Sequence, residues 1–355
     1  MRTPFGRLLA LLLFVAGASA QVSTRDFVGA SRCGTCHPDQ LATQQNSEHA
    51  RALSRPGDHP LAAKFAPSPT YLRAGKYRFR FVQDGPLLKA HAFDATRLID
   101  VPLEWAFGAG SQAVTFASRV DRDWYLEHSL SYYSAAGAYS DTPGQPKPAE
   151  DTLPAALGRL YRSDGTGSDI LRCFQCHSTG PVTRTNAGEL QPMTPGVQCE
   201  ACHGPGKAHS TAATAGTIQN PGRMTPDAMN TFCGQCHREP APTGVATDFK
   251  VAWNVRHQPI YLSQSACFRN SAGVLSCVTC HDPHRELRSD DAFYNSKCSA
   301  CHSQGKRPPA APCLTAASRN CVACHMPQIS PQPYLKFTNH WIGVYGPGDK
   351  LKPLR

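Results

Sequence analysis

Hydrophobic and polar residues alternate most regularly between residues 77 and 126. Residues 77–82 place Tyr, Phe and Phe on one face and Arg, Arg and Val on the other, which predicts a half-buried β-strand. Asp84 and Gly85 then form a turn signal. Residues 113–120 and 124–126, on either side of an Asp-Arg-Asp turn, predict a second pair of strands. We therefore expect a small antiparallel β-rich region here.

The rest of the chain lacks such long periodic segments. Residues 142–154 are rich in proline and predict a linker or extended crossover. Beyond residue 161, Pro and Gly recur between short polar segments, as at residues 204–206, 240–242 and 308–309, which favours short helices joined by loops. We expect four units: residues 1–20, an N-terminal segment 21–60, the β-rich segment with its linker 61–160, and a C-terminal domain 161–355.

Residues 1–20 have the composition of a cleavable export signal. Arg2 and Arg7 precede or flank an apolar run at residues 8–16, and the small residues 18–20 precede Gln21. The run is too short to cross a bilayer, and no later stretch of about twenty apolar residues exists. We expect a periplasmic or extracellular protein without a membrane span, cleaved near Ala20.

A five-residue motif, Cys-x-x-Cys-His, occurs seven times and uses fourteen of the sixteen cysteines. On one helical turn the positions i, i+3 and i+4 share a face, so two thiols can bond the vinyl groups of a porphyrin while the imidazole binds its iron. The motif therefore predicts seven covalently bound c-type haems. Their attachment and proximal residues are Cys33, Cys36 and His37; Cys173, Cys176 and His177; Cys199, Cys202 and His203; Cys233, Cys236 and His237; Cys277, Cys280 and His281; Cys298, Cys301 and His302; and Cys321, Cys324 and His325.

Other uses of paired cysteines fit less well. A thioredoxin-like redox pair or a zinc ribbon does not require histidine at the fifth position in every copy. The two remaining cysteines, Cys267 and Cys313, form an even remainder in an exported chain, so we expect a disulfide between them, with two free thiols as the alternative.

The net charge of +10 suggests an anionic partner only until the cofactors are counted. Loss of residues 1–20 removes two arginines. Fourteen propionates and seven ferric porphyrin charges then bring the total to about +1. We expect arginine and lysine to pair with propionates, and no nucleic-acid motif is present.

Six of the seven motifs follow one another from residue 173, at intervals of 26, 34, 44, 21 and 23 residues. Such spacing leaves little room for a side-chain core, so we expect the porphyrins to supply much of the apolar interior. For Tyr132, Tyr133 and Tyr139 we favour packing on a neighbouring haem over a partner surface.

Eight histidines remain for the second axial position of the irons. His209 and His284 follow their own motifs too closely to reach the opposite face of the same haem, so each is expected to bind a neighbouring one. The histidines that we predict as distal ligands are His49, His209, His284, His340 and His257, whereas His59, His91 and His128 are left open.

Several of these segments resemble multihaem cytochromes related to the tetrahaem cytochrome of ammonia oxidisers and to octahaem tetrathionate- and hydroxylamine-type enzymes. The resemblance lies in residues 27–50, in Cys-Glu-Ala-Cys-His-Gly-Pro-Gly at 199–206 with His209, in Cys-Val-Thr-Cys-His-Asp-Pro-His at 277–284, and in residues 321–326 with 337–341. It implies closely packed haem pairs in helices and loops, with His49 as a distal ligand. Gln45 stands near the place where many relatives have tryptophan.

Two functions follow from these observations. The first is electron transfer by haems with two histidine ligands, between redox partner proteins in the periplasm or at the cell surface. The second is a reductase or oxidase of a small nitrogen or sulfur compound, such as nitrite, hydroxylamine or tetrathionate, at one five-coordinate haem. An adhesive or structural role would leave the cysteines and histidines without use. Assembly of copies into a haem wire stays open.

Overall fold

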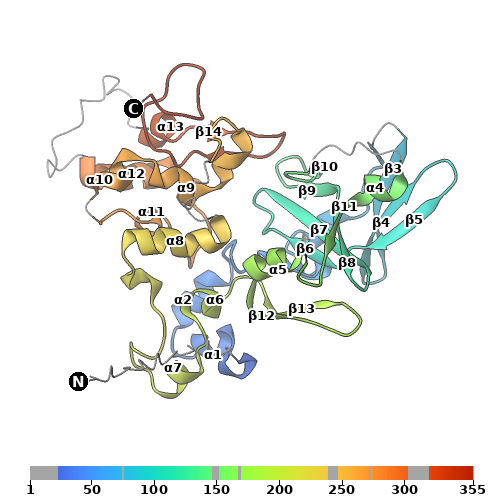
Figure 1. Cartoon of the computed structure of the whole chain (residues 1–355), viewed down its shortest axis with the longest axis horizontal. Helices are drawn as coiled ribbons and strands as arrows, with labels where there is room; N and C mark the ends of the chain where they lie inside the picture. The colour runs from blue at the N-terminus through green and yellow to red at the C-terminus, as the bar shows by residue number, and fades with distance from the viewer. Residues whose placement is uncertain are drawn as a thin grey trace, which may run out of the picture.

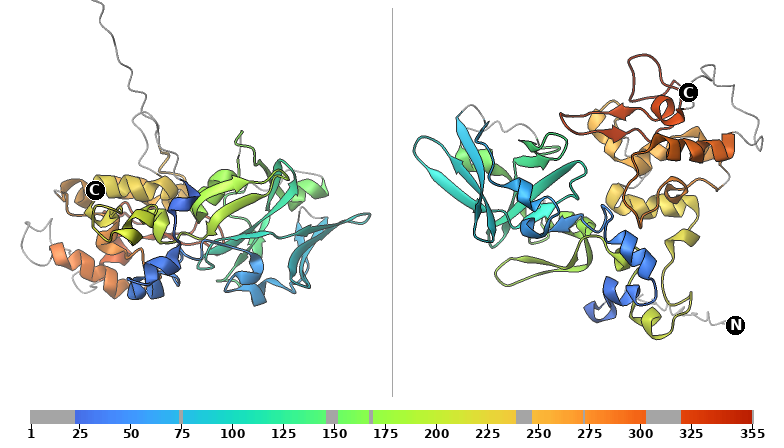
Figure 2. Two further views of the ribbon diagram at one scale, coloured as in Figure 1. Left: turned by 90° about the horizontal axis from the view of Figure 1, so that it is seen from below. Right: turned by 180° about the vertical axis from the view of Figure 1, so that it is seen from behind.

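The computed structural model describes residues 23–73, 76–145, 152–166, 169–238, 247–271, 273–302 and 320–354. The chain forms two parts that lie side by side (Figure 1). One consists of antiparallel sheets and the other of short helices and loops, stacked in a column from α1 at one end to α13 at the other. The views in Figure 2 show the same division from below and from behind.

The larger sheet has seven strands and faces the helical column. Strands β1, β6, β7, β8 and β11 follow one another in it, while β9 pairs with both β7 and β10. The strands are β1 (Leu53–Ser54), β6 (Trp105–Phe107), β7 (Ala113–Asp121), β8 (Trp124–His128), β9 (Leu130–Tyr133), β10 (Ala138–Asp141) and β11 (Gly158–Arg162).

The second sheet has four strands in the order β2 (Tyr71–Arg73), β3 (Tyr77–Asp84), β4 (Leu87–Phe93) and β5 (Leu98–Pro102). The predicted turn joins β3 to β4, and Gly85 there has a φ of 56°, a left-handed value that glycine adopts without strain. The alternation read from residues 77–82 is confirmed, because Tyr77, Phe79 and Phe81 are buried and Arg78 and Arg80 are exposed.

The β-rich region is larger than predicted, since its strands begin at Leu53 and end at Arg162. Both predicted strand pairs are present. Residues 146–151 of the predicted linker lie outside the described residues, but β11, which follows them, returns to pair with β8. Two small hairpins lie elsewhere, β12 (Ser178–Arg184) with β13 (Leu190–Pro195) and β14 (Gln328–Ile329) with β15 (Phe337–Thr338).

A continuous aromatic core fills the space between the two large sheets. Phe81 stacks on Tyr139 with ring centres 3.8 Å apart, and Phe65 meets Phe116 edge to face at 5.1 Å. Tyr132 and Tyr139 belong to this core, and Tyr133 is fully buried beside it. For Tyr132 and Tyr139, the expectation of packing on a haem is therefore wrong, because their strands turn them toward the β-rich interior. Tyr133, the next residue along β9, points to the opposite face, where its ring centre lies 5.8 Å from that of Tyr334, and its packing on a haem stays a prediction.

The helices are short. The α-helices are α1 (Ala30–Gly34), α2 (Pro38–Gln44), α3 (Ala62–Phe65), α4 (Leu153–Leu157), α5 (Leu171–His177), α6 (Cys199–His203), α7 (Lys207–Thr211), α8 (Pro226–His237), α9 (Gln258–Ser263), α10 (Ala266–Asn270), α11 (Cys277–Cys280), α12 (Asp291–His302) and α13 (Cys321–His325). The 3-10 helices are η1 (Thr24–Asp26), η2 (Pro56–Asp58), η3 (Pro221–Arg223) and η4 (Ala252–Arg256).

Apolar side chains contribute little to the helical column. Helices α1, α7, α11, α12 and α13 contain no buried residue, and the cluster around Val255, Ile260, Tyr261 and Ile329 is small. No helix in the described ranges is long and apolar enough to cross a membrane. The predicted export signal lies outside the described residues.

A buried histidine is part of the β-rich core. His128 on β8 is 2 % exposed, and its Nε2 lies 2.7 Å from the hydroxyl of Ser118. That hydroxyl donates its own proton to the Pro102 carbonyl, so Nε2 of His128 is the donor to Ser118. Burial lowers the pKa of His128 to about 3.

This histidine should make stability depend on pH. The folded-state pKa lies below that of an unfolded histidine, about 6.5, so the unfolded chain binds the additional proton and stability falls as the pH drops from about 6.5 toward 3. In His128→Gln, the free energy of unfolding should fall less steeply between pH 6 and pH 4 than in the wild type, by about 1.4 kcal/mol per pH unit. Urea unfolding at a series of pH values measures how the free energy of unfolding changes with pH in the wild type and in the variant. Equal changes in the two proteins would contradict a buried neutral His128.

Candidate haem-binding sites

Each Cys-x-x-Cys-His motif lies on a helical turn in the described residues. Helices α5, α6, α8, α12 and α13 all end at the histidine of a motif, while α1 and α11 hold the first cysteines of theirs. In this geometry the two thiols and the imidazole leave from one side of the turn. The local fold thus presents the donor set that haem attachment requires.

Side-chain caps fix where several of these turns begin. The Thr225 hydroxyl accepts from the Ala228 amide at the start of α8, and the Asn320 side chain accepts from the Ala323 amide before α13. Ser276 and Thr279 form a reciprocal capping box around α11. These caps stabilise helices that make few apolar contacts.

Four additional histidines lie opposite four motif histidines. A metal–imidazole bond is about 2 Å long and the ring centre lies about 1 Å beyond, so two imidazoles on opposite sides of one iron have centres about 6 Å apart. The observed pairs, with their centre-to-centre distances, are His37 and His209 at 6.4 Å, His203 and His284 at 6.1 Å, His237 and His49 at 6.0 Å, and His281 and His340 at 6.1 Å.

In every pair the additional histidine comes from a segment that belongs to another motif. His209 follows the third motif and faces the first, and His284 follows the fifth and faces the third. This is the exchange between neighbours that the sequence predicts for these two residues. The assignment of all four as iron ligands stays a prediction, supported by the ring distances.

Hydrogen bonds orient several of these imidazoles. Nδ1 of His203 lies 2.9 Å from the Gln219 carbonyl, and Nδ1 of His340 lies 2.9 Å from the Thr338 carbonyl. Because a carbonyl only accepts, Nδ1 carries the proton and Nε2 keeps its lone pair. Metal-binding histidines commonly have such a partner on the second nitrogen. His177 and His325 make the same kind of bond, to the carbonyls of Ala52 and Gly343.

Three other histidines are engaged elsewhere. His59 accepts from the Leu61 amide at Nδ1 and donates from Nε2 to the Gly108 carbonyl. Both of its nitrogens are thus used within the protein. His91 on β4 faces Asp100 at 3.6 Å, and His128 belongs to the β-rich core. None of the three lies beside a motif histidine in the described residues.

His257, predicted as a fifth distal ligand, does not lie in such a pair. Its Nδ1 is 3.3 Å from a guanidinium nitrogen of Arg238. Arginine can only donate, so Nδ1 accepts and the proton of the neutral ring is on Nε2, which leaves no lone pair for iron. Burial, followed by the charges of Arg256 and Arg238, lowers the pKa of His257 to about 4. This geometry does not support His257 as a ligand.

Three motif histidines therefore have no second histidine beside them. All fifteen histidines of the chain fall within the described residues, and none forms a ring pair with His177, His302 or His325. The ring nearest to His177 is that of Phe107 on β6, 5.3 Å away.

The second motif is anchored on the large sheet. Phe174 of α5 is fully buried, and its ring centre is 5.4 Å from that of Trp105 and 5.2 Å from that of Phe107. Tyr125 of β8 approaches it from 6.0 Å. These aromatic contacts hold Cys173, Cys176 and His177 between the sheet and the helical column, as Figure 1 shows for α5.

A buried carboxylate joins the first motif to the third. Glu200, which is 5 % exposed, accepts hydrogen bonds from the backbone amides of Val28, Gly29 and Gly206 at 2.9, 2.8 and 2.7 Å. A carboxylate that accepts three amide protons is well satisfied despite its burial. The position between the two cysteines of the third motif thus serves to hold the N-terminal segment.

Sulfur atoms of successive motifs lie next to one another. The thiols of Cys33 and Cys199, of Cys233 and Cys277, and of Cys298 and Cys321 lie close enough to influence each other's ionisation. Cys202 lies near Cys233, and Cys280 lies near Cys301. Cys176 contacts Cys236, which places the second motif beside the fourth. The motif order along the column is thus first, third, fourth, fifth, sixth and seventh, with the second beside the fourth.

Cys313, one half of the predicted disulfide, lies outside the described residues. Cys267 lies on α10 as a partly buried thiol, near Cys280 and Cys301. A bridge between Cys267 and Cys313 stays a prediction.

Comparisons with known proteins agree with this chemistry. A family model described as cytochrome c554 and c-prime matches residues 159–204, which include the second and third motifs. The dissimilatory sulfite reductase MccA of Wolinella succinogenes is 24 % identical over 90 % of this chain and 53 % of its own length. The multiheme cytochrome MtrA of Shewanella baltica is 25 % identical over 57 % of this chain and 59 % of its own length. The chain thus spans between half and three fifths of these relatives.

A solved structure shares the fold. The outer cell wall cytochrome OcwA superposes with a TM-score of 0.51 at 15 % sequence identity, over 89 % of this chain and 79 % of its own. The motif turns, the facing histidine rings and the neighbouring cysteines suit covalent haem, and the relative MtrA is a multiheme cytochrome. This chain is a multihaem c-type cytochrome.

Proposed function

We propose that this protein is an exported electron-transfer cytochrome with seven covalently bound haems, of which at least four have two histidine ligands. The observation that carries the proposal is the set of four facing histidine pairs, all with ring centres 6.0–6.4 Å apart. An iron with two imidazole ligands has no position for a substrate and cycles between ferric and ferrous. The chemistry left to such an iron is electron uptake and release.

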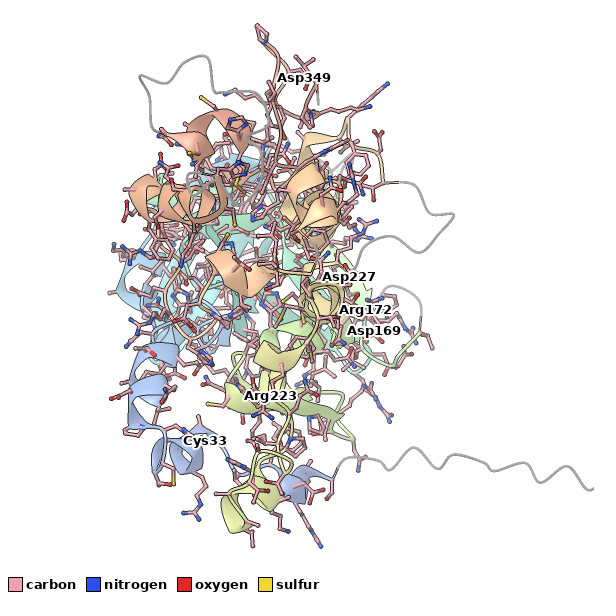
Figure 3. All side chains as sticks on the ribbon, turned by 90° about the vertical axis from the view of Figure 1, so that its left-hand side faces the viewer. Cys33, Asp169, Arg172, Arg223, Asp227 and Asp349 are labelled. Carbon is pink, nitrogen blue, oxygen red and sulfur yellow. The ribbon has the colours of Figure 1, made fainter. Side chains whose placement is uncertain are left out.

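The motif order supports a line of haems along the helical column. Because each haem is bonded to its cysteines, contacts between the sulfurs of two motifs bring the edges of two porphyrins close together. The line would run from the haem at Cys33 to the haem at Cys321, and Figure 3 has Cys33 near one end of the molecule and Asp349 near the other. The haem at Cys173 would be a side branch that meets the line at the haem of Cys233 and Cys236.

The proposed location is the periplasm or the cell surface, and the proposed partners are redox proteins there. This part of the proposal rests on the composition of residues 1–20. The two ends of the line are the places where we expect electrons to enter and leave. Pairing of copies into a longer haem wire stays an alternative, in which a second copy could supply ligands to the three motifs without a facing histidine.

A second candidate function is reduction of a small sulfur or nitrogen compound at one of those three haems. Two observations favour it: His177, His302 and His325 face no other histidine in the described residues, and one relative over 90 % of this chain is a sulfite reductase. An iron without a second protein ligand can bind substrate. The branch haem at His177 is the first place to look, since it lies off the main line.

The haem count and the export signal are tested together. Mass spectrometry of the purified protein should give the mass of residues 21–355 plus seven haems, and acid–acetone extraction should leave the colour on the protein because thioether bonds hold the cofactor. A colourless protein, or one that carries zinc on these sulfurs, would contradict the proposal.

The ligand pairs are tested by removing one histidine at a time. We expect His284→Ala to convert the haem at Cys199 and Cys202 from low-spin to high-spin, which adds one haem equivalent of high-spin ferric signal in electron paramagnetic resonance. His209→Ala should do the same at Cys33 and Cys36. His91→Ala on β4 is the matched control and should leave the spectrum unchanged. If His284→Ala altered only the haem at Cys277 and Cys280, the proposed exchange of ligands would be wrong.

Turnover separates the two functions. With reduced viologen as the electron donor, a reductase should consume one of sulfite, nitrite, hydroxylamine or tetrathionate, and His177→Met should abolish that activity while His302→Met retains it if the branch haem is catalytic. If the protein is only an electron carrier, none of these four compounds should oxidise the reduced protein faster than it oxidises free haem. The second result would remove the basis of the reductase candidate.

A further inference from the structure

A group of cations lies next to the fourth motif. Arg238 directly follows His237, and its guanidinium donates to Nδ1 of His257 at 3.3 Å. Arg256, at the end of η4, comes one residue before His257. The charges of both arginines act on His257, so the three side chains form one cluster.

The cluster is held in place by the surrounding fold. Arg256 stacks over the Trp253 ring at 4.7 Å, and that ring packs against Gly144 and Phe337. His257 is 5 % exposed and forms the N-cap position of α9. Arg238 has a φ of 69°, a left-handed value that costs free energy for a residue with a side chain, so the backbone turns here against its own preference.

The cluster has no acidic counterpart among the residues that the structure describes. The ion pairs of those residues involve other cations, and none includes Arg238 or Arg256. The groups whose charges act on His257 are the two arginines alone. Two guanidinium groups this close repel each other unless an anion lies between them.

We propose that Arg238 and Arg256 form a carboxylate-binding site, and that the carboxylate is a propionate of the haem attached at Cys233 and Cys236. This inference rests on the proposed haem at that motif. The guanidinium group is planar and donates two parallel hydrogen bonds to a carboxylate, which suits a propionate. Covalent attachment at Cys236, two residues before Arg238, keeps this haem beside the cluster.

The site should set the potential of one particular haem. Positive charge close to a haem stabilises the ferrous form, which has one positive charge fewer, and so raises the reduction potential. The cysteines that would hold this haem lie near cysteines of the third and fifth motifs and of the branch motif alike. Arg238 and Arg256 would thus act as positioning residues for the haem where the two routes meet.

The test compares charge-removing with charge-keeping variants in the fully loaded protein. The paramagnetic NMR signals of this haem are first assigned as those that disappear in His237→Met. That variant replaces the proximal ligand of this haem and leaves both arginines in place. In Arg238→Gln and Arg256→Gln, the ferrous-to-ferric ratio of this haem at the wild-type midpoint should fall about tenfold, equivalent to about 59 mV for one electron. Arg238→Lys and Arg256→Lys should keep most of the wild-type ratio, because they keep the charge.

Three outcomes would overturn the inference. One is an unchanged ratio in both Gln variants, and another is an equal change in Arg97→Gln, an exposed arginine of the β-rich part that pairs with Asp94. The third is a wild-type ratio that varies with added acetate or phosphate at constant ionic strength, which would mean that a free anion rather than a propionate fills the site. Absence of haem from Cys233 and Cys236 by peptide mass spectrometry would instead refute the proposed function, so the two failures can be told apart.

Discussion

The proposed coordination of each iron from two sides is the constraint on which the rest of this structure depends. A Cys-x-x-Cys-His turn supplies three bonds from one short segment, but the opposite face of the porphyrin needs a donor from elsewhere. His49, His209, His284 and His340 all face a motif that is not their own. In the proposed coordination, each pair cross-links two distant segments, in a part of the molecule where helices such as α11, α12 and α13 bury no side chain.

The two parts of the chain are consequently held together by different interactions. In the β-rich part, an aromatic core around Phe81, Phe116 and Tyr139 holds the sheets by apolar burial. In the helical column, caps, backbone hydrogen bonds to imidazoles and the Glu200 carboxylate position the motifs. Helix α5 belongs to both, because Phe174 enters the β-rich interior while Cys176 lies against Cys236.

Much of this could be predicted from the sequence, and the failures have physical reasons. The motif spacing identifies attachment sites, and strict alternation at residues 77–82 identifies β3, because both signals are local. Tyr132 and Tyr139 were misassigned since an aromatic residue does not reveal whether it packs on a porphyrin or on Phe65 and Phe81. His257 looked like a ligand because its partner, Arg238, lies on a different helix end and only the fold brings the two together. Sequence likewise does not show that His49 faces His237, because only the tertiary structure brings these two rings together.

The pairing of His49 with His237 also bears on how the protein matures. Ribosomes make the N-terminal segment first, yet its histidine finds its counterpart only after α8 has been produced, and His281 must wait for His340 near the end of the chain. In the proposed coordination, the column cannot close around its irons before residue 340 has been made, which would leave the motif thiols accessible for haem attachment until then. Truncation near the C-terminus would leave an early-made portion without its closing partner, and such a product should be a ready target for proteases.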